Sequence, residues 1–376
     1  MKRISILTLV FSFCFVWTAT AQTQPQSKII TFDVPGASST FPCCVNAAHA
    51  ITGTYLGADG GSLHGFLRAP NGRILTFDPP VSDSSNPTQI YAVHAINDLG
   101  MITGQYFDSD GLVRGFLRAP DGQFTSFDGP GVGSFPWWIG TNARSINRFG
   151  SIAGDYWDET LEAHGFVRTL EGEITIIDAP GAGSAGGFQG TYINSINVWG
   201  VLSGGYVDSD GVGHQFLLTP EGTLTTYDAP DAIPGGTYST CINSDGAVAG
   251  QYFDEGERVH GFLRTPDGKI TDFDPPGALT TYSNGINLTG VIVGFYGDEQ
   301  GVWHGYLRTR DGEFVTFDPP GAGIDPGQGT GASCAGDIAQ FVPCVAINSA
   351  GMIAGSYLDG NNVSHGFLRL PPQTSR

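Results

Sequence analysis

The chain alternates short runs of β-branched and aromatic residues with tight polar turns, and the alternation itself repeats. One complete unit spans residues 96–130. Asparagine, aspartate and glycine at fixed spacings mark its turns, as is typical between antiparallel strands. The turns are Asn97 to Gly100, Asp108 to Gly111 and Pro120 to Gly122. The pattern predicts four strands. The first ends at Ile96-Asn97, and the other three cover Met101–Phe107, Val113–Leu117 and Phe124–Phe127.

The core of this unit, Gly-Phe-Leu-Arg, recurs along the chain at intervals of about 50 residues, a period that indicates a repeat architecture. Its aromatic position is Phe66, Phe116, Phe166, Phe216, Phe262, Tyr306 and Phe367, and we number units 1 to 7 in that order. A single small sheet cannot bury its own apolar faces, so neighbouring units are expected to cover one another.

The chain ends suggest how the repeats are arranged. The Phe-Asp pair that ends the fourth strand of a unit occurs as Phe32-Asp33 before unit 1 and is missing after Phe367. We therefore expect an all-β, seven-bladed β-propeller over residues 22–376, in which residues 28–34 complete the last blade. An open solenoid with a left-over half repeat is the alternative.

A glycine recurs inside the second strand of each unit, at Gly104 in unit 2. It shares a face with Ile102 and Tyr106 by the two-residue period of a strand. Glycine fixed at such a position predicts the close approach of a neighbouring backbone or ring.

The tandem pattern Ile-Asn-x-x-Gly, Gly-x-Tyr, His-Gly-Phe-Leu-Arg and Phe-Asp-x-Pro-Gly resembles the HAF-type extracellular repeats over nearly the whole chain after residue 21. The resemblance implies export and agrees with the propeller expectation. The family is largely uncharacterised, so the resemblance implies no catalytic residue.

The first 21 residues have the pattern of a secretory leader. Lys2 and Arg3 precede an apolar run from Ile4 to Trp17, and small residues end at Ala21. Phe13 precedes Cys14, where a lipoprotein site would have a small residue. We therefore expect a secreted protein, extracellular or periplasmic, and no other segment is apolar for long enough to predict membrane insertion.

The formal net charge of −19 becomes more negative when Lys2 and Arg3 leave with the leader. Such a field repels phosphate backbones, so the charge argues against nucleic acid and against anionic membranes as partners. The 56 glycines and the 40% hydrophobic content are typical of turn-rich β structure rather than of disorder.

Five cysteines lie beyond the leader, and an odd number leaves at least one free thiol unless two chains are linked. They are Cys43, Cys44, Cys241, Cys334 and Cys344. A disulfide between Cys334 and Cys344 is the first expectation, and a bond from either of them to Cys43 or Cys44 is the alternative.

A histidine precedes the core in six units, and an acidic residue stands six positions before it in five of these. The histidines are His64, His164, His214, His260, His304 and His365, and the acids include Asp158, Asp208, Asp254, Asp298 and Asp359. The two should face each other across a hairpin. Metal or general-base chemistry at these pairs is the alternative to a structural role, which repetition in nearly every unit favours.

No cofactor, metal or catalytic residue is predicted. The runs Asp108 to Gly111 and Asp208 to Gly211 resemble the start of a calcium loop but lack its later ligands, and they suit a tight turn equally well. Acidic and basic groups outside the repeat pattern, Asp231, Asp325 and His94, are scattered through separate segments.

Sequence variation is concentrated in the connections from the fourth strand of one unit to the first strand of the next, and these segments are aromatic. Alternating strand directions place them on one rim with the second-to-third hairpins, which is the usual binding side of repeat proteins. The predicted ligand-binding residues are Trp137, Trp138, Phe135, Tyr91, Tyr192, Tyr238 and Tyr282. The alternative is that these rings plug the central channel.

We therefore expect an exported binding module for carbohydrate or another surface polymer, with a polysaccharide or a surface protein as partner. Two alternatives remain. One is a propeller enzyme, such as a glycan lyase or hydrolase, which would need convergent acid and base groups that differ from the repeat. The other is a purely structural or adhesive surface protein.

Overall fold

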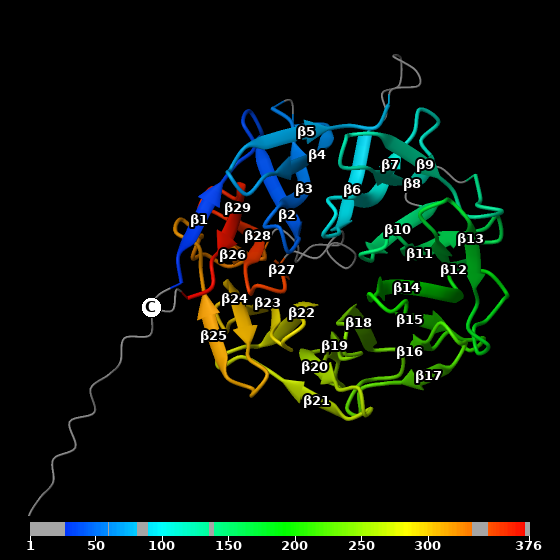
Figure 1. Ribbon diagram of the computed structural model, residues 1–376. Helices are drawn as coiled ribbons and strands as arrows, with labels where there is room; N and C mark the ends of the chain where they lie inside the picture. Colours follow the sequence, from blue (N-terminus) through cyan, green and yellow to red (C-terminus); the bar gives the residue numbers. More distant parts are fainter. Residues whose placement is uncertain (1–26, 59, 81–88, 135–138, 333–344, 373–376) are drawn as a thin grey trace, which may run out of the picture.

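The computed structural model describes residues 27–58, 60–80, 89–134, 139–332 and 345–372. These residues form an all-β structure of small antiparallel sheets arranged around a common centre (Figure 1). The described residues contain no helix that could cross a membrane.

Each unit contributes four strands in the order that the turn pattern predicts, and the first two lie nearest the centre (Figure 1). The first strands are β2 (Ser39–Val45), β6 (Gln89–Ile96), β10 (Thr141–Ile146), β14 (Gly190–Ile196), β18 (Thr237–Ile242) and β22 (Thr280–Ile286), with β26 (Gly329–Thr330) and β27 (Val345–Ile347) in unit 7. The second strands are β3 (Ile51–Leu56), β7 (Ile102–Phe107), β11 (Ile152–Trp157), β15 (Leu202–Val207), β19 (Val248–Phe253), β23 (Ile292–Gly297) and β28 (Ile353–Leu358).

The outer two strands of each unit follow in the same way. The third strands are β4 (Leu63–Arg68), β8 (Val113–Arg118), β12 (Ala163–Arg168), β16 (Gly213–Leu218), β20 (Val259–Arg264), β24 (Trp303–Arg308) and β29 (Ser364–Arg369). The fourth strands are β5 (Ile74–Phe77), β9 (Phe124–Phe127), β13 (Ile174–Ile177), β17 (Leu224–Tyr227), β21 (Ile270–Phe273) and β25 (Phe314–Phe317). In unit 7 the N-terminal strand β1 (Ile29–Phe32) pairs antiparallel with β29.

The hydrophobic core lies between the sheets of neighbouring units. The aromatic residue of each Gly-Phe-Leu-Arg core is fully buried, from Phe66 to Phe367. Phe66 belongs to a cluster that joins unit 1 to unit 7 through Val45, Met352 and Leu368. Each sheet therefore buries its apolar faces against the next sheet.

The recurring glycine of the second strand sits against a β-bulge in the first strand. In unit 2 the register between β6 and β7 shifts at residues 93–95, and a Cβ atom on Gly104 would lie 2.1 Å from the carbonyl oxygen of Ala92. No side chain fits at that distance, which confirms the predicted close approach.

Buried asparagines link the units through hydrogen bonds. The Asn of each first-to-second strand turn, which is Asn-x-x-Gly except for Asn-x-x-His in unit 1, uses its Oδ1 to accept backbone N–H of its own turn. Its Nδ2 donates to the backbone carbonyl of the matching Asn in the next unit. The donor-to-acceptor series is Asn46 to Asn97, Asn147, Asn197, Asn243, Asn287 and Asn348, and Asn348 donates to Asn46 at 2.9 Å.

The arginine of the core motif is a second link between units. In six places its guanidinium lies over the fourth-strand ring of the preceding unit, 4.8–5.2 Å from the ring centroid, and the arginine side chain of unit 1 covers Phe32 of β1. Such stacking adds cation–π attraction to the burial of the ring.

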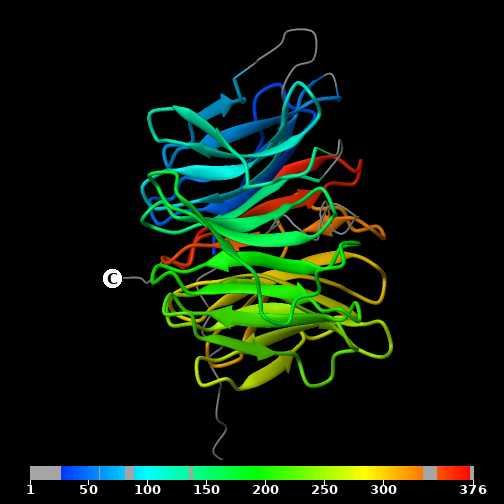
Figure 2. The same ribbon diagram turned by 90° about the vertical axis from the view of Figure 1, so that its right-hand side faces the viewer.

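Two opposite faces result from this arrangement (Figure 2). On the connection face, the fourth-to-first strand connections pack on the second-to-third hairpins, as the bonds from Gly133 N to Trp157 O and from Ala163 N to Gln189 O illustrate. On the turn face lie the Asn-x-x-Gly turns and the third-to-fourth turns. The alternating strands predicted this separation.

Candidate functional site

The repeated histidines lie on the connection face, and five of the six form a bridge between two carboxylates. His Nδ1 is 2.7–3.0 Å from the aspartate that ends a fourth strand, which the sequence did not identify as its partner. In five units His Nε2 lies 3.2–3.7 Å from the expected aspartate of the hairpin. In unit 2 Arg114 bridges Asp108 and Asp128 in the same way.

The surroundings of His214 favour its charged form. A hydrogen bond with Asp228 is the largest cause that raises the pKa of His214, and Asp208 adds to it. Tyr206 lies against the His214 ring, and equivalent tyrosines stack on the other histidines. The bridge ties three strands of a sheet together in unit after unit, so its recurrence agrees with the structural role expected from the sequence.

The calcium-like sequence at Asp108 forms a turn. Asp108 Oδ1 accepts the N–H groups of Asp110 and Leu112 at 2.9 Å, while its Oδ2 binds Arg114. Both carboxylate oxygens thus serve the hairpin.

The predicted binding tyrosines lie at the inner strands, each against another ring. Tyr91 packs edge-on against Phe107, and Tyr238 packs edge-on against Phe253 with 45% of its surface exposed. Tyr282 stacks on Phe295. These rings are therefore held in place by their neighbours while one side remains open in part.

Tyr192 has different surroundings from the other three. Its ring packs against Trp157, and its hydroxyl donates to the carbonyl of Phe188. Burial and the nearby Asp155 raise its pKa, while Arg144 acts in the opposite direction. The remaining predicted residues, Phe135, Trp137 and Trp138, lie outside the described residues.

An ion pair beside Tyr192 departs from the repeat. Arg144 of β10 binds Asp155 of β11, whose side chain is fully buried, and Asn142 donates to the same carboxylate at 2.7 Å. Only 12% of the Arg144 side chain is exposed. Sequence reasoning missed this pair, although no other unit has an arginine at the first position or an acid at the second.

The scattered groups His94, Asp231 and Asp325 stay in separate places. His94 is buried in β6, whereas Asp231 and Asp325 are exposed on two different connections. They do not form an acid–base constellation in the part of the chain that the structure describes.

The cysteine expectations have different outcomes. Cys43 and Cys44 are buried free thiols, so the alternative bond from them to Cys334 or Cys344 is wrong for this structure. Cys43 Sγ donates to Val93 O at 2.9 Å and Cys44 Sγ to His94 O at 2.8 Å, both in the next unit. Cys334 and Cys344 lie outside the described residues.

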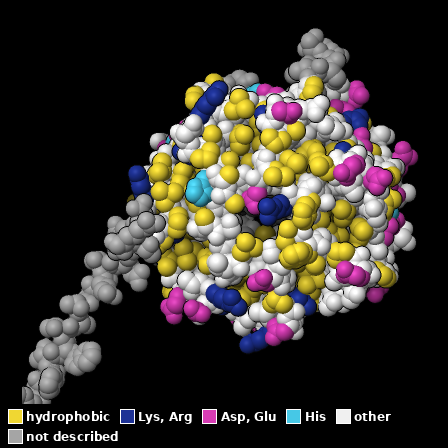
Figure 3. Space-filling view, viewed as in Figure 1, with side chains coloured by type: hydrophobic (Ala, Val, Ile, Leu, Met, Phe, Trp, Pro, Cys, Tyr) yellow, Lys and Arg dark blue, Asp and Glu magenta, His cyan; other side chains and the backbone are white. Residues whose placement is uncertain are grey.

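The turn face carries an apolar groove between units 3 and 4 that the sequence did not predict. Its volume is about 620 Å³, and its lining includes the rings of Phe149 and Trp199, which are 65% and 68% exposed. Ile177 and Leu218 occupy the positions where other units place a fourth-strand ring and an arginine. Apolar side chains are spread over much of this face (Figure 3).

Comparisons with known proteins bear on the fold. No family model matches the chain, and no curated protein matches it. Among solved structures, a streptogramin B lyase is 15% identical with a TM-score of 0.53, covering 92% of this chain and 98% of its own. A prolyl endopeptidase is 11% identical with a TM-score of 0.56, covering 90% of this chain and 51% of its own.

A lectin from Burkholderia pseudomallei is 12% identical over 93% of this chain and all of its own, with a TM-score of 0.47 that is too low to carry an argument. At these identities the likeness concerns the fold alone. The chain has the all-β architecture of repeated sheets found in β-propellers, a fold that serves both binding proteins and enzymes.

Proposed function

We propose that this chain is an exported, closed, seven-bladed β-propeller that binds a neutral polysaccharide through its connection face. Export rests on the leader-like residues 1–21 and on the resemblance to extracellular repeats. The remaining parts of the proposal rest on the contacts of the described residues.

Three contacts between units 7 and 1 support closure into seven blades. The strand β1 pairs with β29, so the last unit has four strands. Asn348 Nδ2 donates to Asn46 O, and the guanidinium of Arg68 covers Phe32. Each of these contacts repeats one that joins neighbouring units elsewhere in the chain.

The observation that carries the binding proposal is the set of tyrosines at the inner strands. Tyr91, Tyr238 and Tyr282 each have a second ring behind them, so their orientation is fixed before any ligand arrives. Flat, pre-oriented rings with polar edges provide the stacking surface that a sugar ring uses, at a low entropic cost.

The net charge of the protein restricts the kind of polysaccharide that it would bind. The protein has a net charge of −19, which opposes uronic acids, sulfated glycans and nucleic acids at long range. A neutral glycan meets no such barrier.

The test is a glycan and polymer array with the mature protein, followed by titration of the best ligand. Tyr238→Ala should weaken binding at least tenfold, and so should the double change Trp137→Ala with Trp138→Ala. Trp199→Ala is the matched control, because it removes an exposed ring from the turn face and should leave binding unchanged. All variants must first show an unchanged melting temperature.

Two outcomes would contradict the proposal. The absence of binding to every neutral polymer would refute carbohydrate recognition, and loss of binding in Trp199→Ala alone would assign recognition to the turn face. Closure is tested separately: deleting residues 28–34 should lower the melting temperature sharply, since β29 would then lose its outer partner.

Turnover of the bound polymer is the second candidate function. The observation in its favour is the Arg144 and Asp155 pair, the charged group outside the repeat that lies beside Tyr192. Incubating the protein with the bound polymer and measuring new reducing ends or unsaturated products decides between binding alone and cleavage.

A further inference from the structure

The second-to-third hairpin of unit 3 differs from its counterparts in one side chain. Glu162 stands two positions before His164. The equivalent residues of the other units are Ser62, Leu112, Val212, Arg258, Val302 and Val363. Unit 3 therefore adds a carboxylate to the repeated aspartate and histidine.

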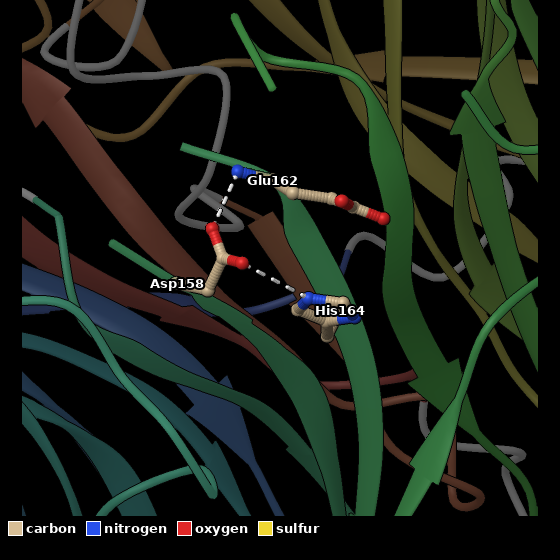
Figure 4. A group of neighbouring side chains, drawn as sticks. All are labelled: Asp158, Glu162 and His164. Atoms are coloured by element: carbon tan, nitrogen blue, oxygen red, sulfur yellow. Dashed lines mark hydrogen bonds and ion pairs between the residues drawn. The ribbon is translucent and has the colours of Figure 1, made fainter. Parts of the chain in front are cut away.

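The added carboxylate completes a compact group of three potential ligands (Figure 4). Asp158, Glu162 and His164 each offer one ligand atom, and these atoms all lie within 4.8 Å of one another. The three side chains are half-buried, so an ion could reach them from solvent.

The orientation of the imidazole is already fixed for a metal. His164 Nδ1 lies 2.9 Å from Asp178, which leaves Nε2 directed at the group. A histidine that binds a metal almost always donates its other ring N–H to a carboxylate or carbonyl, which fixes its tautomer and raises its basicity. Asp178 supplies that partner here.

The Nε2 atom of His164 lies farther from its hairpin aspartate than Nε2 does in the other four units that have such an aspartate. It lies 3.7 Å from Asp158 Oδ2, beyond hydrogen-bond distance, whereas His260 and His304 approach their hairpin aspartates to 3.3 and 3.2 Å. In unit 3 the imidazole and the Asp158 carboxylate are therefore near enough to share an ion without being joined by a hydrogen bond.

The local charge is negative. Asp158, Glu162 and Asp178 lie around one histidine, His164. A divalent cation would offset this concentration of carboxylates.

We propose that Asp158, Glu162 and His164 bind one Zn²⁺ ion, with Asp178 as the carboxylate that orients the histidine. One nitrogen and two carboxylate oxygens are ligands that Zn²⁺ accepts, and three protein ligands leave the fourth tetrahedral position for water or a ligand oxygen. An all-oxygen site would suit Ca²⁺ or Mg²⁺ instead. The ion would connect the hairpin to β12 and β13 on the connection face.

The experiment uses the mature chain without a histidine tag, stripped with chelator and titrated with zinc, calcium or magnesium chloride by calorimetry. The zinc content after gel filtration is measured by mass spectrometry. We expect one zinc per chain and a higher melting temperature when it is bound. Glu162→Gln should weaken zinc binding at least tenfold, and Asp178→Asn by about 10–100-fold, as for other outer partners of metal ligands.

Glu159→Gln is the matched control, because Glu159 lies in the same hairpin, is exposed and stands outside the group of three. It removes the same charge and should leave zinc affinity unchanged. In unit 5, Arg258→Glu places a carboxylate beside Asp254 and His260 and should raise the content to two zinc ions per chain.

The proposal is overturned if the wild-type chain binds no zinc, or if calcium or magnesium binds while zinc does not. It is also overturned if Glu162→Gln and Glu159→Gln reduce zinc affinity equally, since that result would indicate general attraction to acidic residues. Zinc bound only by cysteines would be unaffected by all of these changes, which would refute the site as well.

Discussion

The buried asparagine series allows one hydrogen bond to be isolated by comparing two variants. Asn348→Ala and Asn147→Ala remove the same two turn bonds, because each Oδ1 accepts two N–H groups of its own turn at 2.9–3.1 Å. They differ in the bond to the next unit. Asn348 Nδ2 lies 2.9 Å from Asn46 O, whereas Asn147 Nδ2 lies 3.5 Å from Asn197 O.

The magnitude follows from these distances. Two turn bonds contribute about 1 kcal/mol each to the free energy of unfolding, so both variants should lose about 2 kcal/mol. Asn348→Ala also leaves a buried carbonyl without its donor, which costs about 1–3 kcal/mol more. At 3.5 Å the bond from Asn147 is at the limit of a hydrogen bond and adds little.

The assay is equilibrium denaturation of both variants, with calorimetry as a second measurement. Since 1 kcal/mol shifts Tm by about 2–4 °C in domains of 150–250 residues, Asn348→Ala should melt roughly 2–12 °C below Asn147→Ala. Hydrogen exchange should show the additional loss of protection in units 1 and 7. Equal destabilisation, or a larger loss in Asn147→Ala, would refute the reasoning.

Three further predictions concern other contacts. Hydrogen bonds with aspartates raise the pKa values of His214, His260 and His304 in the fold. The stabilisation that these bonds provide is therefore complete below the ordinary histidine pKa of 6.5 and is lost as the pH rises through the raised pKa values. Above the raised values the Tm of the wild type should fall towards that of a variant with glutamine at all three positions, and Tm curves that stay parallel across the pH range would contradict this. Asp155→Ala removes the buried carboxylate that binds Arg144 and should cost about 3–5 kcal/mol in denaturant, whereas a loss below about 1 kcal/mol would show that water replaces the carboxylate. The double change Ile177→Phe with Leu218→Arg restores the ring and the arginine of the repeat at the apolar groove and should stabilise the fold by about 1 kcal/mol. A lower melting temperature would show that positions 177 and 218 do not face each other as ring and arginine do in the other units.

The local structure of each unit could be predicted from the sequence because its determinants are local. The fourth strand of unit 2 has the predicted bounds, and its second strand begins one residue later than predicted, at Ile102. Turn residues and side-chain alternation fix such elements over a few positions. The close approach of a neighbouring backbone at Gly104 could also be predicted, since a glycine fixed inside a strand has few physical explanations.

Contacts between strands were harder to predict, because they depend on register. The partner of His214 at Nδ1 is Asp228, on the neighbouring fourth strand. The sequence contained a usable signal, a constant offset of 14 residues between histidine and aspartate in five units. The hairpin aspartate is only six residues from the histidine in the sequence, so it is the more obvious partner.

The apolar groove shows a different limit. Ile177 and Leu218 each depart from the repeat in a different unit, and neither departure suggests a cavity by itself. Only the packing of unit 3 against unit 4 shows that both replacements occur at the same contact. A search for paired departures from the consensus would have found this site, and likewise Glu162.

The pairing of β1 with β29 has a consequence for the order in which the protein is made. Residues 29–32 leave the ribosome long before their partners at 366–369. The strand β1 therefore cannot pair until all the intervening units have been synthesised. Until then those units can fold against one another while β1 lacks its partner strand, so this interval is when β1 is most exposed to aggregation and proteolysis.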